Sequence, residues 1–331
     1  MRYTQALEIL RQIDGHDGGA VSTFVWRKAW LVRSNLLAGA ILGAKSPLRK
    51  IPCLRYSRLL GLLASGWREK PVDIATDADA IQVGKNGDRL RSFLCQKGIT
   101  LKVVRENSHY GPATLREIGL RSKMTGSSLL VPKLIGHERK NGFLFVREQL
   151  IEGRSYNIRR DRHRFCTQVV APLAAFYEHT GITMMPLSDA LGPMTAFIAG
   201  GRLDRTMFAR LSALIAENPR VAVSLCHNDV LPSNLAVTPK GVYFLDWGSA
   251  IFSLCGRDFV RIGAGYMGDA AIRGYMQAQI SRLHQSRLGL EDMLLIQELW
   301  LSYCKHLGSY RTDTGAYTSA SGLDRMQCHG S

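Results

Sequence analysis

A polar loop between two short apolar runs constrains this chain more than any other stretch. Residues 226–235 read Cys-His-Asn-Asp-Val-Leu-Pro-Ser-Asn-Leu. One apolar run, residues 222–225, precedes the loop, and a second, residues 242–245, leads into Asp-Trp-Gly at residues 246–248. Short apolar runs bounded by polar turns predict buried strands. The sequence therefore predicts a strand, a loop, a second strand, and then an aspartate at its end.

The spacing His-x-Asp-x-x-x-x-Asn in this loop is typical of in-line phosphoryl transfer. We assign Asp229 as the base that accepts a hydroxyl proton, and His227 joins the catalytic set as the residue that braces the loop. Asn234 and Asp246 supply the hard oxygen ligands that Mg²⁺ prefers. The alternative is an ordinary polar hairpin, but the Asp-Trp-Gly after the second strand favours the catalytic interpretation.

A lysine and a glutamate upstream fit the same chemistry. Lys102 lies in the strand-like residues 99–104, and Glu117 follows in a predicted helix, residues 112–123. A strand lysine held by a helix carboxylate can contact the phosphates of a nucleotide, so Lys102 belongs to both the catalytic and the nucleotide-binding set. A solvated lysine is the alternative, and Glu106 and Arg116 compete for the pairing.

Two further segments are candidates for nucleotide contact. Gly84 and Gly87 lie in a turn whose backbone N–H groups could cover phosphates, although a plain hairpin turn fits equally well. Glu148 and Leu150 lie where a hinge between lobes would present backbone groups to a base.

The chain of 331 residues carries a formal charge of +16, which is its compositional outlier. A basic surface attracts phosphates, nucleic acid or anionic lipid without selecting among them, and we expect no specific nucleic-acid partner. Seven cysteines without a CxxC pair predict reduced thiols and a cytoplasmic protein. We expect no secretory signal peptide, because the first thirty residues contain no apolar core segment.

The pattern along the chain predicts four segments. Residues 1–75 form a basic extension that we expect to be helical, residues 76–150 a small β-rich nucleotide-binding lobe, residues 151–310 a helical catalytic and acceptor lobe, and residues 311–331 a polar tail. The basic residues 20–70 could contact a membrane surface peripherally, at its inner face, or could simply line ordinary helices. Within the helical lobe we predict helices at residues 163–179, 204–218, 265–283 and 291–307, with Asp204 capping the second.

These residues resemble a known family. Leu-Cys-His-Asn-Asp at residues 225–229, Asn234 and Phe-Leu-Asp-Trp-Gly at residues 244–248 look like the catalytic loop and metal aspartate of the aminoglycoside phosphotransferase and choline kinase superfamily. Asp258 resembles its structural aspartate. The resemblance covers about residues 75–310. Gly248 stands where relatives often have glutamate, and the basic extension matches no family pattern.

The resemblance implies an α+β, bilobal protein-kinase-like fold, with ATP and Mg²⁺ as cofactors. It also implies transfer of the γ-phosphate to a hydroxyl of a small molecule, as in choline, ethanolamine or aminoglycoside kinases. A kinase of a lipid-linked or envelope sugar at a membrane surface, and a non-catalytic nucleotide-binding regulator, are the alternatives. Tyr266, Trp300 and Tyr303 could supply an aromatic pocket for choline, or could be helix-packing residues. The sequence does not decide between ATP and GTP or identify the acceptor.

Overall fold

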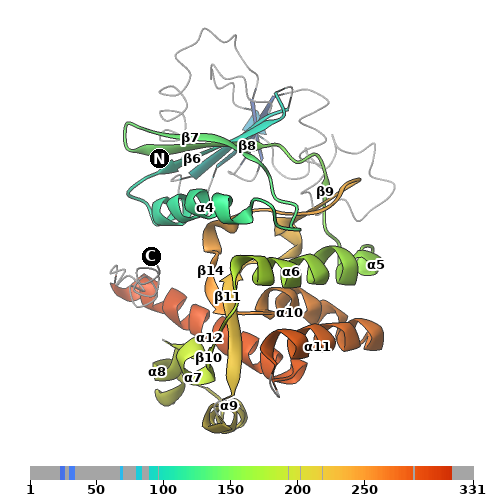
Figure 1. Ribbon diagram of the computed structural model, residues 1–331. Coiled ribbons are helices and arrows are strands. Elements are labelled where there is room, and N and C mark those ends of the chain that lie inside the picture. Colours follow the sequence, from blue (N-terminus) through green and yellow to red (C-terminus); the bar gives the residue numbers. More distant parts are fainter. Residues whose placement is uncertain are drawn as a thin grey trace. The chain divides into compact units, whose positions relative to one another are not determined.

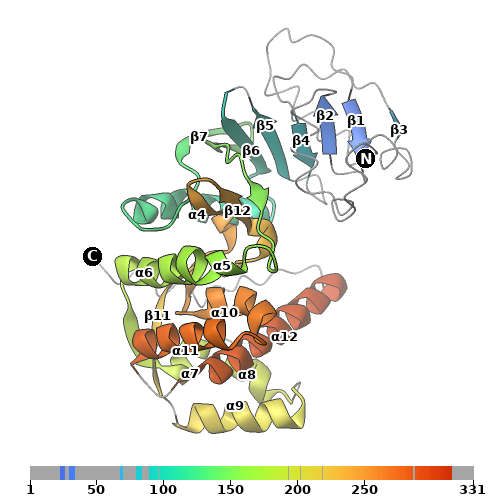
Figure 2. The same ribbon diagram turned by 90° about the vertical axis from the view of Figure 1, so that its right-hand side faces the viewer.

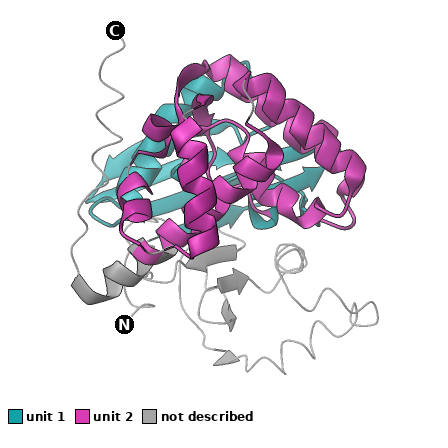
Figure 3. Cartoon of the chain, turned by 90° about the horizontal axis from the view of Figure 1, so that it is seen from below, with its two compact units in different colours: residues 1–157, 232–249 teal, residues 158–231, 250–331 magenta. Residues whose placement is uncertain are grey.

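The computed structural model describes residues 23–26, 30–33, 68–69, 80–83, 89–95, 97–192, 194–201, 203–217, 219–285 and 288–314. The chain forms two compact units, which Figure 3 colours separately. Unit 1 comprises Met1–Asn157 and Pro232–Ser249, and unit 2 comprises Ile158–Leu231 and Ala250–Ser331. The sequence places all of residues 151–310 in one lobe, whereas the structure groups the segment Pro232–Ser249 with the β-rich unit.

Unit 1 is built on an antiparallel sheet with the strand order β3-β1-β2-β4-β5-β6-β8-β7 (Figure 2). The strands are β1 (Thr23–Trp26), β2 (Trp30–Arg33), β3 (Arg68–Glu69), β4 (Ala80–Val83), β5 (Arg89–Leu94), β6 (Ile99–Arg105), β7 (Leu134–Lys140) and β8 (Phe143–Gln149). β-branched and aromatic residues recur in them, as strands favour.

The first three strands correct one prediction. We expected residues 1–75 to be helical, but the ten residues described in this segment belong to β1, β2 and β3. The helix expectation is therefore wrong for them, because Thr-Phe-Val-Trp and Trp-Leu-Val-Arg are rich in residues that pack well on a pleated surface. The other residues of the 1–75 segment lie outside the described residues.

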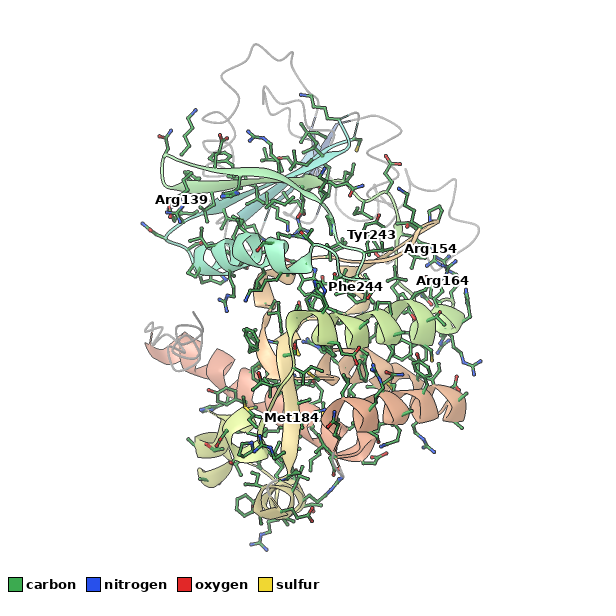
Figure 4. The ribbon with its side chains drawn as sticks, in the orientation of Figure 1. Arg139, Arg154, Arg164, Met184, Tyr243 and Phe244 are labelled. Carbon is green, nitrogen blue, oxygen red and sulfur yellow. The ribbon has the colours of Figure 1, made fainter. Side chains whose placement is uncertain are left out.

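A helix and a tight hairpin complete this sheet. α4 (Tyr110–Met124) lies against it (Figure 1), in agreement with the predicted helix at residues 112–123. β7 and β8 meet at Asn141 and Gly142, with φ angles of 52° and 78°. Two successive positive φ angles define the type I′ turn that joins hairpin strands, and asparagine and glycine are the residues that tolerate it. Arg139 lies beside this turn (Figure 4).

A small second sheet in unit 1 contains the strands between Asn234 and Asp246. Its order is β13-β12-β9, with β9 (Arg154–Ser155), β12 (Leu235–Thr238) and β13 (Gly241–Phe244). Tyr243 and Phe244 of β13 are labelled in Figure 4 and are buried. The N–H of Phe244 donates to the carbonyl of Leu130 at 2.8 Å. The hairpin β12–β13 is thereby hydrogen-bonded to the segment that precedes β7.

Unit 2 is mainly helical around a three-stranded antiparallel sheet, β10-β11-β14. Its strands are β10 (Thr183–Pro186), β11 (Arg220–Cys226) and β14 (Ile251–Leu254). Its helices are α5 (Arg162–Phe165), the π-helical turn η3 (Cys166–Val170), α6 (Ala171–Thr180), α7 (Leu187–Leu191), α8 (Met194–Ala199), α9 (Arg205–Glu217), α10 (Arg257–Gly263), the 3₁₀ turn η6 (Ala264–Tyr266), α11 (Ala270–His284) and α12 (Leu290–Thr314).

The predicted helices of this region are present. Four apolar residues within the predicted helix at residues 163–179 are fully buried: Phe165, Val169, Leu173 and Phe176. The backbone N–H of Met207 donates to Asp204 Oδ1 at 2.9 Å, which confirms the predicted cap of α9. Residues 311–314 belong to α12 rather than to the predicted polar tail. Among the described residues, no helix is both long and apolar enough to cross a membrane.

A buried histidine joins α11 to the sheet of unit 2. His284 Nδ1 accepts a hydrogen bond from the N–H of Ala222 at 3.0 Å, and its Nε2 lies 2.9 Å from the carbonyl of Cys255. Because Nδ1 is the acceptor, Nε2 carries the proton and the ring is neutral. Burial lowers the pKa of His284, and the hydrogen bond to Cys255 opposes this shift only in part.

Core truncation in α6 tests the packing of unit 2. Phe176 is fully buried, and we expect Phe176→Ala to lower the free energy of unfolding by about 3–5 kcal/mol. Phe208 on α9 is 42% exposed, so Phe208→Ala is a matched control with an expected loss of less than about 1 kcal/mol. Chemical denaturation followed by circular dichroism measures both. Equal losses in the two variants would contradict the assigned burial.

The neutral His284 makes unit 2 sensitive to mild acid. Because its folded pKa lies below the unfolded value of about 6.5, the unfolded chain binds more protons as the pH falls through that value, and stability drops by at most about 1.4 kcal/mol per pH unit. We expect His284→Gln to flatten the loss measured by thermal unfolding between about pH 7.5 and pH 5.5. The exposed His137 provides the control His137→Gln, which should keep the wild-type slope. An unchanged slope in His284→Gln would contradict the assignment.

Candidate active site

The predicted site residues are divided between the two units. His227 and Asp229 lie in unit 2, and the others that the structure describes lie in unit 1: Lys102, Glu117, Glu148, Leu150, Asn234 and Asp246. The predicted phosphate-covering turn with Gly84 and Gly87 lies outside the described residues. Each unit therefore carries part of the predicted set.

Lys102 is held by two carboxylates inside unit 1. It lies on β6, between β5 and β8, and its side chain is 5% exposed. Its Nζ is 3.0 Å from Glu117 Oε1 on α4 and 3.1 Å from Glu148 Oε2 on β8. The pairing of Lys102 with Glu117 is the one that the sequence predicts. Glu106, the competing carboxylate, instead lies 3.3 Å from Arg139 Nη1.

Arg121 closes this pair into a ring of four charges that the sequence analysis did not find. Its Nη2 lies 2.8 Å from Glu117 Oε1 and 3.1 Å from Glu148 Oε2. Burial by itself raises the pKa of Glu117, but Lys102 and Arg121 outweigh it, and the pKa is lowered below its usual value. Glu117 is therefore ionised at neutral pH. The i,i+4 spacing of Glu117 and Arg121 on a predicted helix could have indicated this ion pair from the sequence.

Glu148 and Leu150, at the end of β8, are hydrogen-bonded or ion-paired to other residues of unit 1. The side chain of Glu148 belongs to the ring, and its backbone is paired within the sheet opposite Thr100 and Leu134. The N–H of Leu150 donates to the carbonyl of Gly98 at 2.8 Å. Contact of this segment with a nucleotide base stays a prediction.

The hairpin β12–β13 brings the two predicted metal ligands to one of its ends. Leu235 pairs with Phe244, and the N–H of Leu245 donates to the carbonyl of Asn234 at 2.8 Å. Asn234 therefore lies just before β12 and Asp246 just after β13, at the same end of the hairpin. Asp246 has a φ of 64°, a left-handed conformation that aspartate tolerates better than most residues. The next residue, Trp247, is fully buried, and its Nε1 donates to the carbonyl of Phe244 at 3.1 Å. An amide and a carboxylate oxygen at one end fit Mg²⁺, which takes few protein ligands and completes its shell with phosphate and water.

Two arginines that the sequence analysis did not select face Asp246. Arg89 Nη1 and Arg91 Nη2 on β5 each lie 3.7 Å from Asp246 Oδ2. Burial lowers the pKa of Arg91, but Asp246, Glu148 and Glu117 outweigh it, so the pKa is raised. Alternation along a strand places residues two apart on one face. The spacing of Arg89 and Arg91 therefore predicts that they share a face of the strand, but it does not identify Asp246 as their partner.

In unit 2, one carboxylate fixes the start of the predicted catalytic loop. Asp258 of α10 accepts the N–H groups of His227 at 2.8 Å and Asn228 at 2.7 Å. It also accepts the hydroxyl of Tyr177 at 3.1 Å, and burial raises the pKa of that hydroxyl well above its usual value. The fully buried His227 accepts the N–H of Asp229 at its Nδ1, at 3.3 Å. Asp258 and His227 thus both brace the loop backbone.

Asp229 is paired with an arginine that the sequence analysis missed. Its Oδ1 lies 3.2 Å from Arg261 Nη2, and Arg261 Nη1 donates to the carbonyl of Asn228 at 2.9 Å. The side chain of Asp229 is 33% exposed, so a proton can reach it. Arg257 donates to the side-chain oxygen of Asn228, whose φ is 65°. These contacts aim the Asp229 carboxylate and keep it next to a positive charge.

The aromatic residues considered for an acceptor pocket have packing roles in unit 2. Tyr266 is buried, donates to the carbonyl of Ile158 at 2.7 Å and lies with its ring 4.6 Å from that of Phe165. The guanidinium of Arg257 lies 3.9 Å from the centre of the Trp300 ring.

Comparisons with known proteins address the fold. No family model matches the chain. No curated protein matches it in sequence. Among solved structures, an aminoglycoside 2'-phosphotransferase in complex with GDP superposes with a TM-score of 0.51 at 14% identity, over 72% of this chain and 87% of the other.

Two weaker structural similarities accompany it. One is to an aminoglycoside phosphotransferase from Streptomyces rimosus in complex with ADP and streptomycin, with a TM-score of 0.43, 14% identity, and 75% and 98% of the two chains covered. The other is to a choline/ethanolamine kinase family protein from Mesorhizobium loti, with a TM-score of 0.46, 11% identity, and 72% and 81% covered. The first match supports the fold assignment: the chain has the α+β, protein-kinase-like fold of the aminoglycoside phosphotransferases.

Proposed function

We propose that this protein is an ATP- and Mg²⁺-dependent phosphotransferase that moves the γ-phosphate to a hydroxyl group of a small molecule. The observation that carries the proposal is the buried Lys102–Glu117 ion pair on a protein-kinase-like fold. A buried lysine is costly unless it is paired, and two carboxylates within 3.1 Å hold the Lys102 ammonium in one place. A fixed ammonium is suited to orient phosphate oxygens for in-line transfer.

Asp229 supplies the acceptor side of the chemistry. Its carboxylate would accept the proton of the acceptor hydroxyl while the oxygen forms its bond to phosphorus and the nucleoside diphosphate leaves. Arg261 Nη2, 3.2 Å from Asp229 Oδ1, aims the carboxylate. Positioning of this kind provides most of the catalysis in phosphoryl transfer, because the protein forms no covalent bond.

Asn234 and Asp246 would hold the Mg²⁺. The ion, when bound, neutralises charge that develops on the phosphate oxygens. The positively charged chain also fits an acceptor presented at an anionic membrane surface, such as a lipid-linked sugar. That alternative, peripheral membrane contact and a cytoplasmic location stay predictions, and an acceptor screen by ATP consumption, with choline, ethanolamine, aminoglycosides, sugars and lipid-linked sugars side by side, separates the acceptors.

Substitution of the base tests the proposal. We expect Asp229→Asn to lower Mg²⁺-dependent ATP turnover with the acceptor found in that screen by about 10²–10⁴-fold, the typical contribution of a general base. Asp189→Asn removes a charge from an exposed aspartate of the same unit and should leave turnover unchanged. Turnover at the wild-type level in Asp229→Asn would exclude the assigned role. Nucleotide binding without turnover by the wild-type protein, across the whole acceptor panel, would favour a non-catalytic regulator instead.

A further inference from the structure

We propose that Arg89 and Arg91 form a second phosphate-binding element in unit 1, which contacts the polyphosphate of the donor nucleotide beside Lys102. The inference rests on the proposed function and adds two residues that bind the donor. When the donor binds, both arginines exchange the carboxylate of Asp246 for phosphate oxygens.

The sheet places the three cations together. Arg91 on β5 pairs directly with Lys102 on β6, and residues directly opposite in an antiparallel ladder share one face. Arg89 lies two residues before Arg91 and therefore on that face as well. Its guanidinium lies 4.8 Å from the centre of the Tyr110 ring at the start of α4, which restricts its position. Three cationic side chains thus line adjacent positions of two paired strands.

The contacts of the two arginines with Asp246 are looser than those in the ring of four charges. Both arginine–aspartate distances are 3.7 Å, whereas hydrogen-bonded ion pairs have distances of about 2.7–2.9 Å. The four distances within the ring lie between 2.8 and 3.1 Å. In addition, the buried Nε of Arg91 has no hydrogen-bond partner within the part of the chain that the structure describes. The two guanidinium groups are therefore close to an anion without being fully satisfied by it.

The charge balance indicates what would satisfy them. The ring contains two cations and two carboxylates, so it is neutral by itself. The remaining members, Arg89, Arg91 and Asp246, leave one net positive charge. If Asp246 held a divalent ion, that excess would rise to three. A ligand with several negative charges is then needed at this face, and a metal-bound nucleoside diphosphate or triphosphate has that chemistry.

Arginine is suited to this role because its planar, forked guanidinium donates two parallel hydrogen bonds to phosphate oxygens, whereas lysine acts as a point charge. Arg89 and Arg91 are 34% and 16% exposed in their side chains, so both can be reached by a ligand. Lys102 and the two arginines would then contact different oxygens of one polyphosphate.

Calorimetric binding by the full-length protein tests the inference without requiring turnover. The probes are Mg-ADP, inorganic tripolyphosphate with Mg²⁺, and adenosine. We expect Arg89→Met and Arg91→Met each to raise the Kd for Mg-ADP and for tripolyphosphate on the order of tenfold, the loss expected for one hydrogen bond to a charged group. The Kd for adenosine, which has no phosphate, should not change.

The matched control is a second arginine of the same sheet, Arg147. Arg147→Met removes a half-exposed arginine that is ion-paired with Glu138 on the same sheet, and it should bind all three probes as the wild type does. Unchanged affinity for Mg-ADP in both β5 variants would overturn the inference. An equal loss of affinity for adenosine and for Mg-ADP would also overturn it, because that result indicates damage to the fold. If the wild-type protein turns over ATP and the variants bind normally, only this inference fails. If the wild type binds neither Mg-ADP nor tripolyphosphate, the proposed function fails with it.

Discussion

The ring formed by Lys102, Glu117, Glu148 and Arg121 is the interaction on which unit 1 depends. Four charged groups lie within 3.1 Å of their partners with less than a tenth of each side chain exposed. Isolated charges at that depth would be strongly unfavourable, and loss of one member leaves another uncompensated. The ring joins β6, β8 and α4, so the position of Lys102 is coupled to the docking of the helix on the sheet.

In unit 2, a single carboxylate, that of Asp258, organises the buried polar groups of the loop. Asp258 accepts two backbone N–H groups and a tyrosine hydroxyl, and charge-assisted hydrogen bonds of this kind are among the stronger ones in proteins. They hold Asn228 in a left-handed conformation, which orients the backbone just before Asp229. Each unit thus fixes its own share of the predicted site residues with its own buried polar network. The chain joins the two shares covalently, because only four residues separate Asp229 from Asn234.

Sequence reasoning succeeded where local structure determines the outcome. A strand lysine followed by a helix glutamate, and an apolar strand that leads into Asp246, follow from hydrophobic periodicity and spacing. It missed Arg89, Arg91 and the ring position of Glu148, because those contacts depend on which strands are neighbours and on the course of the chain after β13. The strands β1 to β3 were missed because short apolar stretches interrupted by basic residues fit a helical period as well as a strand period.

Both sets of predicted site residues are flanked by arginines, and this arrangement bears on the acceptor. Arg261 lies beside Asp229, and Arg257 covers one face of Trp300 at 3.9 Å. A quaternary ammonium such as choline would need that aromatic face and would have to displace a buried guanidinium from it. Trp300, one of the three aromatic residues that suggested choline from sequence alone, is therefore better explained as packing that supports Arg257, which donates to Asn228 in the predicted catalytic loop.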